Sequence, residues 1–165
     1  MRLRKHSGAS VEAIEAEYRR KRVEYLRVAA AVGGSWERAE DVVQEAFAKA
    51  VRARRQYKGE SPLSGWIARI VVNVARDEAR RASSVPVEGD LIDASPGASS
   101  WVGTIISQLP ERQRLVLFLR YYADMDYRTV AAAAGMEVGS VGPTLSAALK
   151  TLRRLMAEVE TNERY

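Results

Sequence analysis

Apolar residues recur along this chain at spacings of three and four, the pattern of α-helices that bury one face. The pattern predicts a first helix over 10–32, with room for a break inside it and an end at the glycine pair that follows. A second helix is predicted over 36–56, with Ser35 as its capping residue. The apolar positions of these two helices are Val11, Ile14, Tyr18, Tyr25, Leu26 and Ala29, then Ala39, Val42, Val43, Ala46, Phe47, Ala50 and Val51.

A third helix is predicted from Ser61 to Arg81, with Ser61 as the cap and Pro62 at the first helical position. Its apolar face holds Leu63, Trp66, Ile67, Ile70, Val71 and Val74. Another face carries basic and amide side chains at spacings of four, three and four: Arg69, Asn73, Arg76 and Arg80. Guanidinium groups bind phosphate, and an indole such as that of Trp66 can stack on an unpaired base. The helix suits a nucleic-acid strand, although a solvated basic face over a core tryptophan fits the pattern equally well.

The second half of the chain is also helical in pattern, after a change of composition. Residues 82–100 are rich in Ser, Gly, Pro and Asp, which is typical of a flexible linker. Three helices are predicted here. The first begins at Pro110, and the second covers 127–134 with Asp126 as its cap. The third follows the break at Gly135 and ends near residue 160. In that last helix Pro143 predicts a kink, or a start only near Gly142. Its inward positions are expected at Val141, Leu145, Leu149, Leu152 and Met156.

No segment shows the strict alternation of a β-strand, so the sequence predicts an all-α fold. We expect two small helical domains, over 10–82 and 104–160, joined by a flexible linker over 83–103. The length of 165 residues agrees with one or two small domains.

The segment from Tyr127 to Val141 has the spacing of a helix-turn-helix. Ala131 is small where two helices approach, and Gly135 can adopt the left-handed conformation of a tight turn. An ordinary helical hairpin is the alternative interpretation. The second helix would enter the major groove, yet no Arg or Lys occurs between Arg128 and Lys150. Base contacts would therefore depend on small side chains, with DNA contacts expected at Arg128, Ser140, Thr144 and Lys150.

Charge is distributed unevenly over a chain of net charge +5. Residues 1–82 hold 18 Lys and Arg against 11 Asp and Glu, whereas residues 83–165 hold 8 against 10. The basic excess lies in the first half, where a polyanion would be expected to bind. Cysteine is absent and His6 is the single histidine, so we expect no catalytic residues, no metal site and no cofactor. No apolar run approaches a membrane span and no secretory signal is evident, so we expect a cytoplasmic protein without membrane insertion.

An acidic patch stands out within the basic half, on the outer face of the 36–56 helix. It consists of Glu40, Asp41, Gln44 and Glu45. Acidic residues stabilise a helix N-terminus, and this structural role alone would explain the patch. They also suit docking on a basic protein surface. A basic cluster follows towards the Tyr57 loop and comprises Arg52, Arg54, Arg55 and Lys58.

Four motifs in order resemble a known family. They are A-E-D-V-V-Q-E-A-F (39–47), S-G-W-I-A-R-I-V-V-N-V-A-R-D (64–77), L-P-E-R-Q-R (109–114) and the helix-turn-helix (127–141). Together they resemble a bacterial extracytoplasmic-function sigma factor of the sigma-70 superfamily. The likeness covers about residues 10–157. Such factors have two helical domains, sigma-2 and sigma-4, separated by a linker.

The resemblance implies roles for particular residues. In this family the acidic helix docks on the clamp of the polymerase beta-prime subunit, which implies polymerase binding by Glu40, Asp41, Gln44 and Glu45. The following loop and helix hold the melted non-template strand of the minus-ten element, with a flipped base in the loop at about 54–64. That implies strand binding by Arg55, Tyr57, Lys58, Trp66, Arg69, Asn73, Arg76 and Arg80. The sigma-4 domain is expected to contact the minus-35 element and the beta flap.

The main hypothesis is a promoter-specificity subunit of RNA polymerase, and not an enzyme. The principal alternative is a stand-alone helix-turn-helix regulator, against which the acidic patch and the weakly basic recognition helix both argue. An interaction protein without promoter activity is a third hypothesis. An anti-sigma factor is a further expected partner, to which linker residues could contribute, namely Leu91, Ile92 and Trp101.

Overall fold

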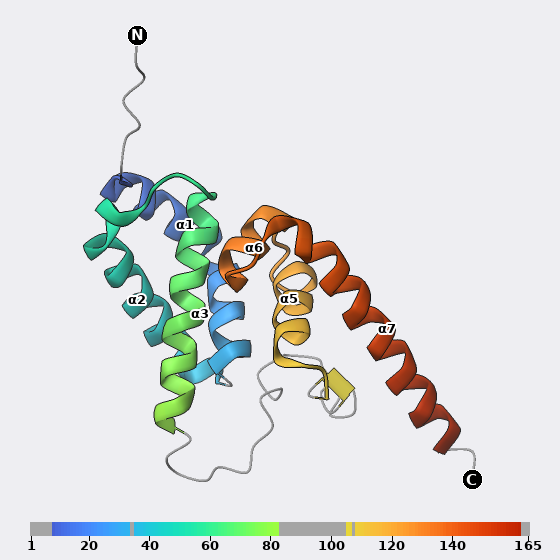
Figure 1. Cartoon of the computed structure of the whole chain (residues 1–165). Coiled ribbons are helices and arrows are strands. Elements are labelled where there is room, and N and C mark those ends of the chain that lie inside the picture. Colours follow the sequence, from blue (N-terminus) through green and yellow to red (C-terminus); the bar gives the residue numbers. More distant parts are fainter. Residues whose placement is uncertain (1–7, 34, 83–104, 107, 163–165) are drawn as a thin grey trace.

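The computed structural model describes residues 8–33, 35–82, 105–106 and 108–162 (Figure 1). In this part of the chain the longer elements are all α-helices, as expected. The first half contains α1 (Val11–Gly33), α2 (Trp36–Arg52), a 3-10 turn η1 (Arg54–Gln56) and α3 (Leu63–Ala82). The second half contains α5 (Glu111–Tyr121), α6 (Tyr127–Ala134) and α7 (Val138–Asn162). The expected linker over 83–103, with Leu91, Ile92 and Trp101, lies outside the described residues.

Helices α1, α2 and α3 pack around a shared apolar core. The ring of Phe47 from α2 meets Tyr25 of α1 edge to face, with centroids 5.2 Å apart. The fully buried larger aliphatic side chains of these helices are Ile14, Val28, Val43, Ile67, Val71 and Val72. The break predicted within the first helix is confirmed, because Lys21 has non-helical backbone angles (φ −121°, ψ 20°). Val11, expected on the apolar face, is instead 42% exposed at the start of α1.

Helix boundaries near the Tyr57 loop differ slightly from the predicted ones. α2 ends at Arg52 rather than near residue 56, and the 3-10 turn follows it. α3 begins one residue later than expected, because the carbonyl of Pro62 accepts the first hydrogen bonds, from the N–H groups of Gly65 and Trp66. The prediction that Ser61 caps this helix is therefore wrong. Its carbonyl instead accepts a hydrogen bond from the Tyr57 hydroxyl at 2.6 Å.

The helix-turn-helix has the predicted local signals. The N–H of Thr129 donates to the Asp126 carboxylate at 2.8 Å, which caps α6. Gly135 ends α6 in the left-handed conformation with φ 66°, where a side chain would be strained. Val141 is fully buried and holds α7 onto the rest of the unit.

The predictions for the last helix are corrected in two respects. α7 begins at Val138 and runs through Pro143, so it does not start near Gly142. The proline leaves the carbonyl of Gly139 without its helical donor, but Gly139 is exposed and water can satisfy that carbonyl. Met156, expected to face inward, is 42% exposed, because the neighbouring Leu155 is the residue that this turn of α7 buries.

The two halves pack against each other through α3 and α6, with a smaller contact between α1 and α5 (Figure 1). Gly65 permits the close approach. A Cβ atom at Gly65 would lie 2.7 Å from the Ala132 Cβ and 3.3 Å from the Thr129 Cα. Within the described residues, no helix is both long and apolar enough to cross a bilayer.

Candidate nucleic-acid interface

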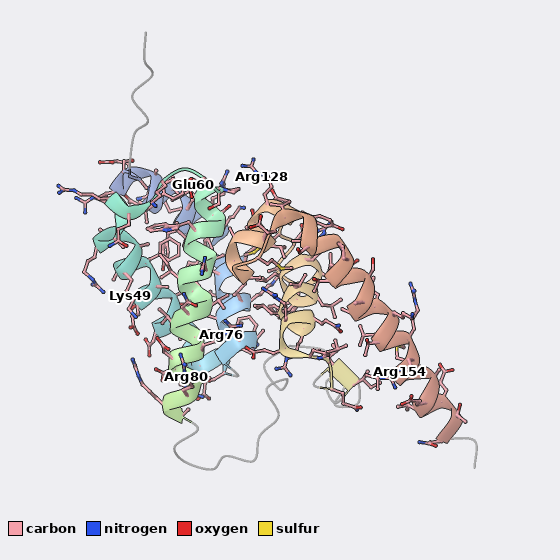
Figure 2. All side chains as sticks on the ribbon, viewed as in Figure 1. Lys49, Glu60, Arg76, Arg80, Arg128 and Arg154 are labelled. Atoms are coloured by element: carbon pink, nitrogen blue, oxygen red, sulfur yellow. The ribbon has the colours of Figure 1, made fainter. Side chains whose placement is uncertain are left out.

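The basic face of α3 is present in the structure, but its members differ in their surroundings. Arg69, Asn73 and Arg80 are exposed. Arg80 pairs with Asp77 in the same helix. Arg76 forms an ion pair across the junction of the two halves, with its Nη2 3.0 Å from Oε1 of Glu111 on α5. Figure 2 shows Arg76 and Arg80 along α3. The sequence predicted the ridge, whereas the partner of Arg76 comes from the other half of the chain.

The sequence left open whether Trp66 is a core residue or an exposed ring for stacking, and the structure shows features of both. It is half-buried and packs against the core, yet it also borders an open cleft. Its ring lies 5.5 Å from that of Tyr57, tilted by 50°. Burial raises the pKa of Tyr57, and the charge of Arg128 opposes that rise. The two rings therefore form an aromatic pair at the start of α3, beside the exposed side chains of Arg55 and Lys58.

An open cleft of about 560 Å³ lies between the two halves. Its lining from the first half is Glu60, Ser61, Trp66 and Arg69, and from the second half Arg112, Ala131, Ala132, Gly135, Met136, Glu137 and Ser140. Two arginines and two glutamates give it mixed charge. The Arg69 guanidinium lies close to Gly135, because a Cβ there would be 3.3 Å from Nη2. Sequence reasoning missed Arg112, Met136 and Gly135 as neighbours of the basic face of α3, since only tertiary packing brings them there.

Two residues of the acidic patch form ion pairs within the chain, and two are exposed. Glu40 forms an ion pair with Arg22 of α1, and this hydrogen bond is the main reason that the pKa of Arg22 is raised. Glu45 lies 3.1 Å from the ammonium group of Lys49 one helical turn later. Asp41 and Gln44 are exposed on α2. The patch therefore presents Asp41 and Gln44 most openly to a partner.

The four residues expected to contact duplex DNA do not form one cluster. Ser140 and Thr144 lie one turn apart near the start of α7, where the Thr144 hydroxyl donates to the Ser140 carbonyl at 2.7 Å. Lys150 is exposed further along the same helix. Arg128 lies in the first turn of α6, close enough to the Tyr57 loop to influence the Tyr57 pKa (Figure 2). The structure thus brings Arg128 to the loop of the first half.

Two family models match the chain in sequence. Sigma-70 region 2 matches residues 17–85, and sigma-70 region 4 matches residues 99–152. The chain belongs to the sigma-70 family. This sigma factor is 31% identical to the RNA polymerase sigma-H factor of Pseudomonas aeruginosa and 34% identical to the ECF RNA polymerase sigma-E factor of Escherichia coli K12. The alignments cover 62% and 61% of this chain and 65% and 64% of the relatives, just under two thirds of their length.

The fold is also that of solved sigma factors. The sigma factor resembles CnrH, in a structure with the cytosolic domain of CnrY, at a TM-score of 0.67 and 24% identity over 91% of both chains. It resembles the sigma factor RpoE of Bartonella quintana, in a structure with the anti-sigma factor NepR, at a TM-score of 0.65 and 19% identity. That match covers 87% of this chain and 96% of the other. The resemblance to ECF sigma factors, stated from the motifs, is confirmed.

Proposed function

We propose that this sigma factor binds core RNA polymerase in the cytoplasm and directs promoter-specific initiation of transcription. It contributes recognition, while the phosphodiester chemistry belongs to the polymerase. The observation that carries the proposal is the arrangement of α3, where exposed Arg69 and Asn73 continue from the Tyr57–Trp66 aromatic pair. The proposed units are 10–82 for clamp and strand binding, 83–103 as linker and 104–160 for duplex binding.

Strand capture follows from the chemistry of that face. Aromatic rings stack on unpaired bases regardless of sequence, and guanidinium groups bind the phosphates between them. The exposed side chains of Arg69 and Asn73 would contact the backbone of a strand whose bases reach the loop. Arg76 joins them once it exchanges the Glu111 carboxylate for a phosphate.

Polymerase binding is assigned to α2, on a different helix from the strand-binding face. Asp41 and Gln44 would contact the beta-prime clamp, with Glu40 and Glu45 beside them. Glu40 also orients the patch through its ion pair with α1. The helix-turn-helix of α6 and α7 would contact the minus-35 element and the beta flap. An anti-sigma factor is a proposed partner, since the sigma factor RpoE, a structural neighbour, was solved with the anti-sigma factor NepR.

The alternative is a regulator that binds duplex DNA without polymerase. The complete helix-turn-helix, with its cap at Asp126 and turn at Gly135, supports a duplex-binding role for this unit. Affinity for duplex DNA comes largely from basic side chains, and α7 offers none before Lys150. This favours binding of DNA together with polymerase.

The deciding experiment combines the purified chain with bacterial core RNA polymerase and genomic promoter fragments, and maps the 5′ ends of the transcripts. We expect discrete starts that require the chain. Core polymerase alone, and core with the Asp41→Arg variant, serve as controls. Absence of polymerase binding, together with tight binding of one duplex by the chain alone, would establish the regulator instead.

A further inference from the structure

The residues before α1 contact the Tyr57 loop through their backbone. The N–H of Gly8 donates to the carbonyl of Tyr57 at 2.8 Å, and the N–H of Ala9 donates to the carbonyl of Arg54 at 2.8 Å. We call Gly8 and Ala9 the N-terminal strap. Backbone hydrogen bonds at both ends of one short turn restrict it more than a single contact would, since they fix its position and its orientation.

Glycine is required at the first strap position. Gly8 has φ 114°, a conformation that other residues rarely adopt. A Cβ atom there would lie 3.2 Å from the carbonyl oxygen of Arg54 and 3.2 Å from the Cα of Arg55. Both neighbours are backbone atoms of the loop, so they could not move aside without the loop moving. A side chain at this position would push the strap and the loop apart.

The strap contacts the loop at the residue that organises it. Tyr57 receives the strap on its carbonyl, donates its hydroxyl to the Ser61 carbonyl and places its ring beside Trp66. Beyond it, Lys58, Gly59 and Glu60 are exposed. Gly59 has φ 71° and no atoms within 4 Å of a Cβ position. The loop is thus held at Tyr57 and open at its tip.

The strap is itself fixed by α1. Ser10, the next residue, accepts a hydrogen bond from the N–H of Ala13 at 3.0 Å and so caps the first turn of α1. Ile14 in the following turn is fully buried in the core. Besides its chain connections to α2 and α3, the loop is therefore tied to α1 through Gly8 and Ala9. A loop that receives a base without reorganisation needs a support of this kind, because ordering it during binding would cost affinity.

We propose that the N-terminal strap is a positioning element that holds the 54–61 loop in the conformation that accepts one unpaired base of the minus-ten strand. The inference rests on the function proposed above and adds to it a residue outside the strand-binding face. Gly8 acts through Tyr57 and Arg54 and does not itself touch the DNA. Its loss should reduce discrimination at one base and leave polymerase binding intact.

The test uses the full chain with core polymerase on a promoter mapped by the transcription experiment. Single abasic sites are first placed along the minus-ten non-template strand, and open-complex formation by wild type is measured at each. The position with the largest loss marks the base held by the loop, and for a stacked base that loss should be roughly tenfold or more. Open-complex formation is then measured for Gly8→Val on the intact promoter and on that abasic promoter. Ser10→Ala is the matched control, because it weakens the same end of α1 through the Ala13 hydrogen bond.

Each outcome has a distinct meaning. We expect Gly8→Val to be several-fold less active than wild type on the intact promoter and equal to it on the abasic one, with unchanged polymerase affinity. The activity of Gly8→Ala on the intact promoter should lie between those of Gly8→Val and wild type. Ser10→Ala should keep the wild-type ratio of activity on the intact promoter to activity on the abasic one. An equal loss for Gly8→Val on both promoters would overturn the proposal, because it would show a general effect on folding. Failure of wild type to initiate at all would instead refute the sigma function on which the inference rests.

Discussion

Gly65 of α3 faces Ala132 of α6 at a distance that leaves no room for a side chain on Gly65. A Cβ atom there would approach the Ala132 Cβ to 2.7 Å, below ordinary van der Waals contact. This contact joins the first helical unit to the second, beside the cleft that Trp66 and Arg69 line. Small residues on both helices therefore determine how closely the helix-turn-helix unit packs on α3.

Enlarging Ala132 should separate the two units. We expect Ala132→Leu to overpack the junction at a cost of about 1–3 kcal/mol, which the chain can avoid by releasing α6 from α3. Small-angle scattering should then show a larger radius of gyration with unchanged helical content. Ala147→Leu is the control, since it adds the same volume at an exposed position of α7. An unchanged radius for Ala132→Leu would show that the junction yields locally.

Removal of the exposed groups on α3 should affect strand capture alone. We expect Arg69→Ala and Asn73→Ala to slow open-complex formation while polymerase affinity stays within about twofold of wild type, since these residues lie on another helix from the acidic patch. Arg69→Ala should also reduce the salt dependence of strand binding by about 0.7 in the log–log slope, the value for one single-strand phosphate contact. Filter binding of the holoenzyme over a salt series measures that slope, with Arg19→Ala on α1 as the control. Loss of polymerase binding in either α3 variant would contradict this division of the surface.

Charge reversal on α2 should have the opposite effect. We expect Asp41→Arg to weaken binding of core polymerase by at least about tenfold, because a basic partner surface would then face a like charge. Binding of a minus-ten oligonucleotide by preassembled holoenzyme should be little changed. Glu37→Arg reverses a charge at another exposed position of the same helix and serves as the control. Equal affinities for Asp41→Arg and wild type would exclude this patch from the interface.

The cap of α6 should give the second unit a pH-dependent stability. Hydrogen bonds from Thr129 lower the pKa of Asp126 below its usual value of 3.8. A carboxylate with a depressed pKa stabilises the fold above the unfolded-state pKa, and that contribution is lost as pH falls through the folded-state value. We expect Asp126→Ala to cost about 1 kcal/mol at pH 7, and less below about pH 4.

Urea unfolding at pH 7 and pH 3, followed by circular dichroism, measures this difference. Asp126→Ser keeps an oxygen acceptor for the Thr129 N–H but has no carboxylate to titrate. Its stability relative to wild type should therefore improve as the pH falls. A cost for Asp126→Ala that is the same at both pH values would show that the charge of the cap contributes nothing.

Local signals were the part of this fold that the sequence predicted well. The helix periods, a break within the first helix, the cap at Asp126 and the turn at Gly135 each depend on a few neighbouring residues. Of the two outcomes predicted for Pro143, a kink or a late start, the late start is wrong, because the proline removes only one helical hydrogen bond and the carbonyl affected is exposed.

Relationships between distant segments could not be predicted from the sequence. The pair of Arg76 with Glu111 and that of Arg22 with Glu40 join residues on different helices, and no spacing rule connects them. The ridge on α3 and the acidic patch on α2 were found from one helix at a time. The cleft, the strap and the place of Arg128 beside the Tyr57 loop required the tertiary fold.

Trp66 and Ser140 border the same cleft, although they are assigned to promoter elements far apart on the DNA. The minus-ten and minus-35 elements lie roughly 25 base pairs apart, which at about 3.4 Å per base pair is about 85 Å of B-form duplex. Two residues that line one cleft cannot contact elements that far apart on the DNA at the same time. On the proposed function, the helix-turn-helix unit must therefore leave α3, and the cleft must open, when the sigma factor is loaded onto a promoter.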